Sequence, residues 1–124
     1  MQSVIIITAA PLDLDAIIAG ARRIGVIELH SQVQLAVKGD WGHFILDVYD
    51  SIADDYEPEA LQRVRTLIRE PHFAQLMYRE AAALDQGVLL LPECWIDNDH
   101  GLLAPIEDIR ARIARGEDWR RATQ

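Results

Sequence analysis

The pattern of apolar and polar residues changes its period several times along the chain, and each change predicts a new element. Residues 4–8 form a β-branched apolar run, which is typical of a strand buried on both faces. Apolar residues then recur at helical spacing over residues 14–21, with Asp13 placed to cap this helix and Gly25 to end it. The period falls to two across residues 27–38, which predicts one half-buried strand.

The middle of the chain predicts a hairpin followed by a long helical region. Residues 38–42 carry turn chemistry, and the apolar alternation resumes on the return strand, so this pairing is expected to be antiparallel. An acidic loop at residues 50–57 precedes Pro58, a residue suited to the first turn of a helix. Helical spacing then continues to Gly87, with Pro71 expected to kink or restart the helix.

The last third predicts a buried strand at residues 88–91, a hairpin formed by residues 95–96 and 102–103, and a final helix opened by Pro105. The first six predicted elements match the split βαβ, or ferredoxin-like (βαββαβ), arrangement: an α+β fold with both helices on one face of an antiparallel sheet. The C-terminal hairpin and helix would extend it and cover half of the other face. No linker or repeat interrupts the chain, so residues 1–124 are predicted to form a single domain.

Composition places the chain among ordinary globular proteins. Its 124 residues are 50% hydrophobic and 26% charged, and no stretch reaches the roughly 20 apolar residues that a membrane span needs. The N-terminal apolar run has no basic residues before it and stops at Pro11, which favours a buried strand over a signal peptide. We therefore expect a cytoplasmic protein that does not associate with membranes.

Charge is the feature that bears most on partners. Twelve basic and 20 acidic residues give a net charge of −8, which argues against nucleic acid and anionic lipid and favours a basic protein partner. The acidic residues are concentrated between Asp47 and Glu59, a span without Lys or Arg. Such a cluster raises the association rate of a positively charged partner. The candidate partner-binding residues are Trp41, Asp47, Tyr49, Asp50, Asp54, Asp55 and Glu57.

A second interpretation of the same span stays open. It is a solvated loop whose last acidic residues, Glu57 and Glu59, favour the start of the following helix.

Motifs of catalysis and of cofactor binding are not found. The seven glycines are dispersed, with no nucleophile elbow, phosphate loop or dinucleotide fingerprint, so no cofactor is predicted and an enzyme is not favoured. The four histidines lack metal-ligand spacing, and residues 97–101 fit a hairpin turn better than a calcium loop. Cys94 is the only cysteine, which excludes both an intrachain disulfide and a four-cysteine zinc site.

In size, acidity and lack of catalytic motifs the chain is similar to small inhibitors that bind a toxin or nuclease, such as bacterial immunity proteins and phage anti-defence proteins. This compositional resemblance implies a non-catalytic module whose acidic edge binds a basic protein. The alternative is a small ligand-binding or enzymatic domain that uses the exposed half of the sheet. In that case a homodimer would close a pocket around His30, His43, Asp47 and Tyr49.

Overall fold

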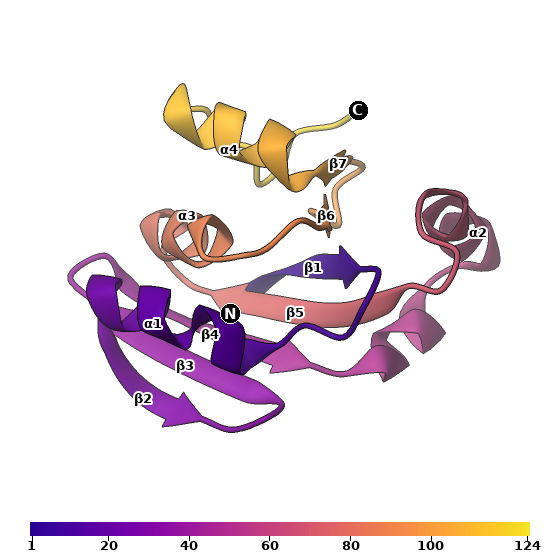
Figure 1. The fold of residues 1–124 in the computed structure, drawn as a ribbon. Helices are drawn as coiled ribbons and strands as arrows, with labels where there is room; N and C mark the ends of the chain where they lie inside the picture. Colours follow the sequence, from indigo (N-terminus) through magenta and orange to yellow (C-terminus); the bar gives the residue numbers. More distant parts are fainter.

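The computed structural model describes all 124 residues and shows a mixed α+β fold built on one seven-stranded antiparallel sheet (Figure 1). The strands lie in the order β2-β3-β4-β5-β1-β6-β7. Four α-helices and one 3₁₀ helix, η1, join them. The elements in chain order are β1 (Gln2–Thr8), α1 (Leu14–Ile24), β2 (Val26–His30), β3 (Gln34–Gly39), β4 (Gly42–Val48), η1 (Asp50–Asp55), α2 (Pro58–Leu67), β5 (His72–Tyr78), α3 (Ala81–Leu89), β6 (Trp95–Asp97), β7 (Leu103–Pro105) and α4 (Ile106–Ala114).

The first face of the sheet carries the main core. Side chains of α1, α3 and α4 pack there against alternate residues of the strands, and α3 and α4 are stacked above the sheet in Figure 1. Phe44, Leu76 and Leu84 are completely buried in this layer, and so, almost completely, is Trp119 from the C-terminal segment. The core therefore joins residues from both ends of the chain.

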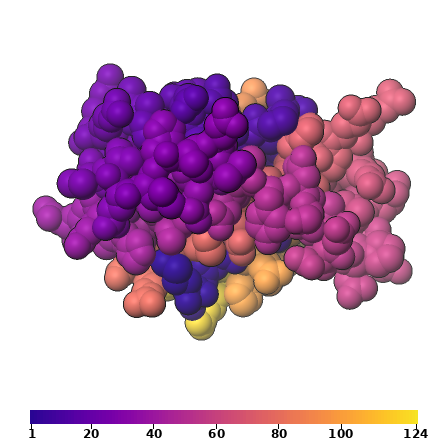
Figure 2. Space-filling model, turned by 90° about the horizontal axis from the view of Figure 1, so that it is seen from below, coloured from indigo at the N-terminus to yellow at the C-terminus, as the bar shows by residue number.

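The second face is covered over only part of its area. Ile7 and Phe73 point to this side and pack with Ile52 of η1 and Val64 of α2 in a smaller core. Figure 2 views the molecule from below, with β2 to β4 in purple at one side and the segment of η1 and α2 in magenta to pink at the other. Val26 and Leu29 of the edge strand β2 remain exposed.

The predicted strand at residues 4–8 and the helix after it are confirmed. Asp13 caps α1 by accepting a 3.0 Å hydrogen bond from the Asp15 amide, and Gly25 ends this helix. In β1, Ile6 and Ile7 belong to opposite cores, as a strand buried on both faces requires.

The single strand predicted over residues 27–38 is wrong, because a turn divides it into β2 and β3. The Ser31 hydroxyl accepts hydrogen bonds from the amides of Val33 (3.3 Å) and Gln34 (3.0 Å), which closes the turn. A bulge between Ile27 and Leu29 then moves Leu29 out of the face of Ile27.

The continued helix predicted beyond Pro71 is also wrong. The helix α2 ends at Leu67, and His72–Tyr78 form β5, which pairs with both β1 and β4. The start of β5 is held by a residue of η1, since Asp50 Oδ1 accepts a 3.0 Å hydrogen bond from the Phe73 amide.

The strand predicted at residues 88–91 is wrong in turn, because Val88 and Leu89 complete α3. Gly87 lies within this helix rather than ending it. A Cβ atom at Gly87 would come within 3.0 Å of the Leu76 side chain and 3.3 Å of Phe44, so the absence of a side chain allows α3 to approach the sheet closely.

The ferredoxin-like arrangement is not confirmed. Instead of the predicted residues 88–91, it is β5 that lies beside β1, and β5 also separates β1 from β4. The predicted C-terminal hairpin and helix are present as β6, β7 and α4. The strands β6 and β7 extend the sheet from the other edge of β1, and α4 packs with α3 on the first face instead of covering the open one.

Both edges of the sheet are poorly suited to adding another strand. At one edge, β2 is five residues long and bulged near Glu28. At the other, β7 is three residues long and ends in Pro105, and the Leu103 amide donates to Gln124 Oε1. None of the four α-helices is long and apolar enough to cross a membrane.

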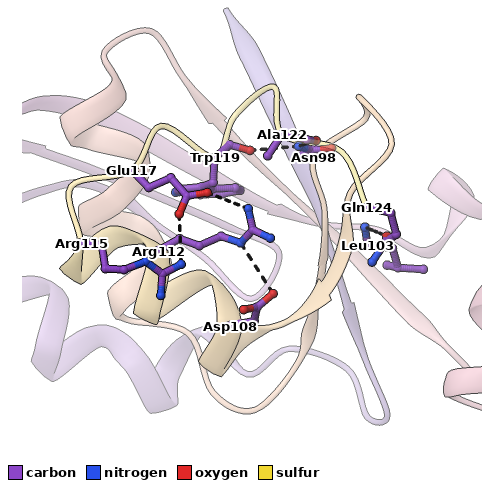
Figure 3. A network of polar contacts seen from close by, with 9 residues as sticks. All are labelled: Asn98, Leu103, Asp108, Arg112, Arg115, Glu117, Trp119, Ala122 and Gln124. Atoms are coloured by element: carbon purple, nitrogen blue, oxygen red, sulfur yellow. Dashed lines mark hydrogen bonds and ion pairs between the residues drawn. The ribbon is translucent and has the colours of Figure 1, made fainter.

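The C-terminal segment is held to the turn after β6 by Asn98, which is 2% exposed (Figure 3). Its Nδ2 donates to the carbonyl oxygens of Trp119 (3.0 Å) and Ala122 (2.8 Å). Its Oδ1 accepts the amides of His100 (2.9 Å) and Leu102 (3.0 Å). All the donors and acceptors of one buried carboxamide are thus used.

Replacing Asn98 by Ala should destabilise the protein by roughly 2–4 kcal/mol, because four hydrogen bonds are lost and their partners stay partly buried. Urea unfolding followed by tryptophan fluorescence measures this. The control is Gln124→Ala, which removes one exposed hydrogen bond and should cost less than about 0.5 kcal/mol. Equal losses for the two variants would contradict the role given to Asn98.

Candidate functional site

A pocket of about 400 Å³ lies on the second face, between the segment of η1 and α2 and residues of β1, β5 and β6. We call it the acidic pocket. It is formed where the chain leaves β4, where it enters α2 and where it turns after β6, so segments distant in sequence meet there. Its lining residues are Ser3, Ile5, Tyr49, Ile52, Asp55, Tyr56, Glu57, Ala60, Gln75, Asp97 and Asp99.

Four of the lining residues are acidic and none is basic. Asp55 ends η1, and Glu57 precedes α2 without making a capping hydrogen bond. Asp97 ends β6, and Asp99 follows in the turn with a φ of 62°, a left-handed conformation that Asp tolerates better than most residues. The positive φ thus lets the turn bring Asp99 to the pocket.

Of the four carboxylates, Asp97 is the one that forms hydrogen bonds within the protein. One of its oxygens accepts the Tyr56 hydroxyl at 2.7 Å, and the other accepts the Asp99 amide at 2.8 Å. Burial, and then the hydrogen bond to Asp97, raise the pKa of Tyr56 far above its usual value, so its hydroxyl remains a donor. The Tyr56 ring also packs against Phe73, with ring centroids 5.6 Å apart.

The other three carboxylates have no such partners. The side chains of Asp55, Glu57 and Asp99 form no hydrogen bond or ion pair with the protein, and all three residues are exposed. The apolar part of the wall is supplied by Ile5 and Ile52. What the pocket offers is therefore negative charge beside aromatic and aliphatic surface.

A smaller hollow of about 200 Å³ continues the acidic pocket along α2. The two share Tyr56, Ala60, Asp97 and Asp99. Arg63 lines the smaller hollow and is the one basic residue of the pair.

Three of the seven predicted partner-binding residues line the acidic pocket: Tyr49, Asp55 and Glu57. Tyr49 is 44% exposed. Asp54 is exposed nearby and does not line the pocket. Asp50 lies apart, where the Phe73 amide and then the neighbouring His72 hold the pKa of its carboxyl below the usual value.

The remaining two predicted residues lie elsewhere. Asp47, on β4, accepts a 2.8 Å hydrogen bond from the Gln34 side chain. Trp41 lies in the turn between β3 and β4. Its indole N–H donates to the Ile24 carbonyl at 3.2 Å and its ring stacks on Phe44, so it is half-buried.

The four residues of the alternative ligand site do not gather. His30 faces α1 and lies 2.8 Å from an Asp15 carboxylate oxygen on the first face. His43 and Asp47 alternate with Phe44 and Leu46 and so point to the second face, as predicted. Tyr49 belongs to the acidic pocket.

Sequence reasoning missed Tyr56, Asp97 and Asp99. Residues 97–101 were correctly interpreted as a turn, and Asp99 indeed has turn geometry. The sequence pattern does not show that β6 lies beside β1, and this pairing brings the turn close to Asp55 and Glu57.

Metal binding and thiol chemistry find little support in the geometry. No three side chains of His, Cys, Asp or Glu are grouped so that they could hold a metal ion. Cys94 is buried, and burial raises the pKa of its thiol to about 12, which disfavours the nucleophilic thiolate.

Comparison with protein-family models, with curated proteins and with solved structures finds no significant match to this chain.

Replacing Tyr56 by Phe should lower the free energy of unfolding at pH 7 by about 1–2 kcal/mol, because it removes the hydrogen bond to Asp97. The pKa of Tyr56 is higher in the folded state than in the unfolded state, where it is near 10. The protonated hydroxyl therefore stabilises the folded protein fully below about pH 10, and this stabilisation is lost as the pH rises further. The difference between wild type and Tyr56→Phe should therefore shrink above about pH 10.

Urea unfolding at pH 7 and between about pH 9 and 11 tests this expectation. Tyr49→Phe is the control, since the Tyr49 hydroxyl has no protein partner and its loss should change stability little at pH 7. A difference between wild type and Tyr56→Phe that is constant with pH would contradict the assignment.

Proposed function

We propose that this protein is a non-catalytic module that binds a basic protein, and that a Lys or Arg side chain of the partner enters the acidic pocket. The observation that carries the proposal is the set of three carboxylates, Asp55, Glu57 and Asp99, around one hollow without a protein partner. A cationic side chain that enters the hollow would find acceptors that no protein group occupies.

The chemistry of the pocket suits a guanidinium or ammonium group on a side chain. Carboxylates form their strongest hydrogen bonds with such cations, and Arg matches them with two parallel N–H groups. Tyr49 and Tyr56 add aromatic surface, on which a cation is attracted to the ring face. Ile5 and Ile52 can receive the aliphatic stem of the same side chain.

Long-range charge supports the same kind of partner. The net charge of −8 attracts basic proteins and speeds their approach, while the pocket supplies the short-range contact. An inhibitor that neutralises a basic toxin or nuclease combines these two requirements. This class is the function that we propose.

The pocket can be tested separately from the overall charge. Asp55→Asn with Glu57→Gln removes two pocket charges, and Asp54→Asn with Glu59→Gln removes two neighbouring charges that do not line it. The probe is a fluorescent peptide with one Arg in a Gly-Ser background, and the readout is anisotropy at low and high salt. We expect the pocket variant to bind at least about tenfold more weakly and the control about twofold, because a screened distant charge contributes little.

Equal losses in the two double variants would assign the binding to the acidic segment as a whole and reject the pocket. The natural partner is sought by capture with the tagged protein at low and high salt. A partner that is basic, is released by salt and is lost with the pocket variant would support the proposal. A partner retained by that variant would contradict it.

A further inference from the structure

A second pocket, of opposite character, lies where the two ends of the chain meet. It has a volume of about 520 Å³ and is bordered by the start of β1, the turn after β6 and the C-terminal segment. Figure 2 shows these three segments side by side at the lower edge, in indigo, orange and yellow. We call it the arginine pocket. Its lining residues are Met1, Gln2, Ser3, Tyr78, Asn98, Asp99, His100, Arg120 and Arg121.

Two arginines line this pocket although the chain as a whole is acidic. Arg121 is exposed and forms no ion pair or hydrogen bond with the protein. Arg120 uses Nε and Nη2 on the Asp118 carboxylate, at 2.9 and 2.8 Å, and its Nη1 has no acceptor. Asp118 and Asp99 balance the charge of the two guanidinium groups, but neither binds Arg121 or Nη1 of Arg120, so these donors are free.

Tyr78 provides an independent observation. It is 3% exposed and its ring belongs to the main core, yet it borders the arginine pocket and its hydroxyl has no hydrogen-bond partner. Burial raises the pKa of Tyr78, so the hydroxyl is a donor at neutral pH. The hydroxyl itself is open to the pocket, so it is a free donor for a ligand bound there.

The segment that carries the two arginines is held firmly in place. Asn98 binds the carbonyl oxygens of Trp119 and Ala122, the residues on either side of Arg120 and Arg121 (Figure 3). Trp119 is 1% exposed, and its indole N–H lies 3.3 Å from an Asp85 oxygen. A backbone held in this way places both arginines at the pocket before a ligand binds.

We infer that the arginine pocket binds a tetrahedral oxyanion of the phosphate class, carried by a small phosphomonoester. The donors are the Arg121 guanidinium, Nη1 of Arg120 and the Tyr78 hydroxyl. A phosphate group presents oxygens in several directions, which matches donors that come from two separate segments. A carboxylate presents two oxygens in one plane and one charge. This inference goes beyond the proposed function, because it concerns an anion in a different pocket.

The test is a titration of the whole protein with inorganic phosphate, followed by amide NMR shifts, against chloride at equal ionic strength. Saturable shifts are expected around Asp99, His100, Arg120 and Arg121. Tyr78→Phe should weaken phosphate binding about tenfold while leaving urea stability unchanged, since its hydroxyl makes no internal hydrogen bond. Arg121→Gln should weaken it at least as much.

Two controls separate this pocket from general charge effects. Arg115→Gln makes the same change of charge away from the pocket and should leave phosphate affinity within about twofold of wild type. The double variant Asp55→Asn with Glu57→Gln should also retain phosphate binding, so failure of the proposed function would not affect this result.

Three results would overturn the inference. One is a set of phosphate shifts no larger than those with chloride, and another is wild-type phosphate affinity in Tyr78→Phe. The third is tighter binding of acetate than of phosphate, which would reject the phosphate class. A phosphomonoester such as glycerol phosphate should bind at least as tightly as inorganic phosphate.

Discussion

The pairing of β5 with strands on both of its edges is the constraint on which the rest of the molecule depends. This strand joins β1 to β4 and so connects the N-terminal strand with the two hairpins that precede η1. Its alternate residues serve both faces: Leu76 and Tyr78 enter the main core, while Phe73 supports the smaller core. The same strand brings Gln75 to the acidic pocket and Tyr78 to the arginine pocket. The backbone hydrogen bonds of β5 to β1 and β4 therefore position residues of both candidate sites.

Elements whose signals are local could be predicted from the sequence. Asp13 and Gly25 delimit α1, the turn at residues 39–42 closes its hairpin, and Pro105 opens α4, because caps and turns are decided by neighbouring residues. Residues 72–78 and 81–89 could not be told apart by pattern, since their apolar residues fit a strand or a helix. Contacts distant in sequence decide between them: Asp50 accepts the Phe73 amide near the start of β5, and Gly87 packs against Leu76.

The candidate sites show the same limit. The acidic segment contributes Asp55 and Glu57 to the acidic pocket, and the concentration of charge was visible in the sequence. Asp97 and Asp99 complete it from about forty positions further along, and only the order of strands brings them there. The arginine pocket is less visible still, because Arg120 and Arg121 look like an ordinary polar end of the chain. Their meaning depends on Asn98, which fixes this segment beside Tyr78.

The two blunted edges of the sheet limit how this molecule can associate. With a bulge in β2 and a proline at the end of β7, neither border offers a regular row of backbone groups to an incoming strand. Another protein would then be bound through side-chain contacts, which are chemically selective, and not through added strand pairing, which accepts almost any extended peptide. The same two borders protect a chain with exposed Val26 and Leu29 against growth into fibrillar sheets.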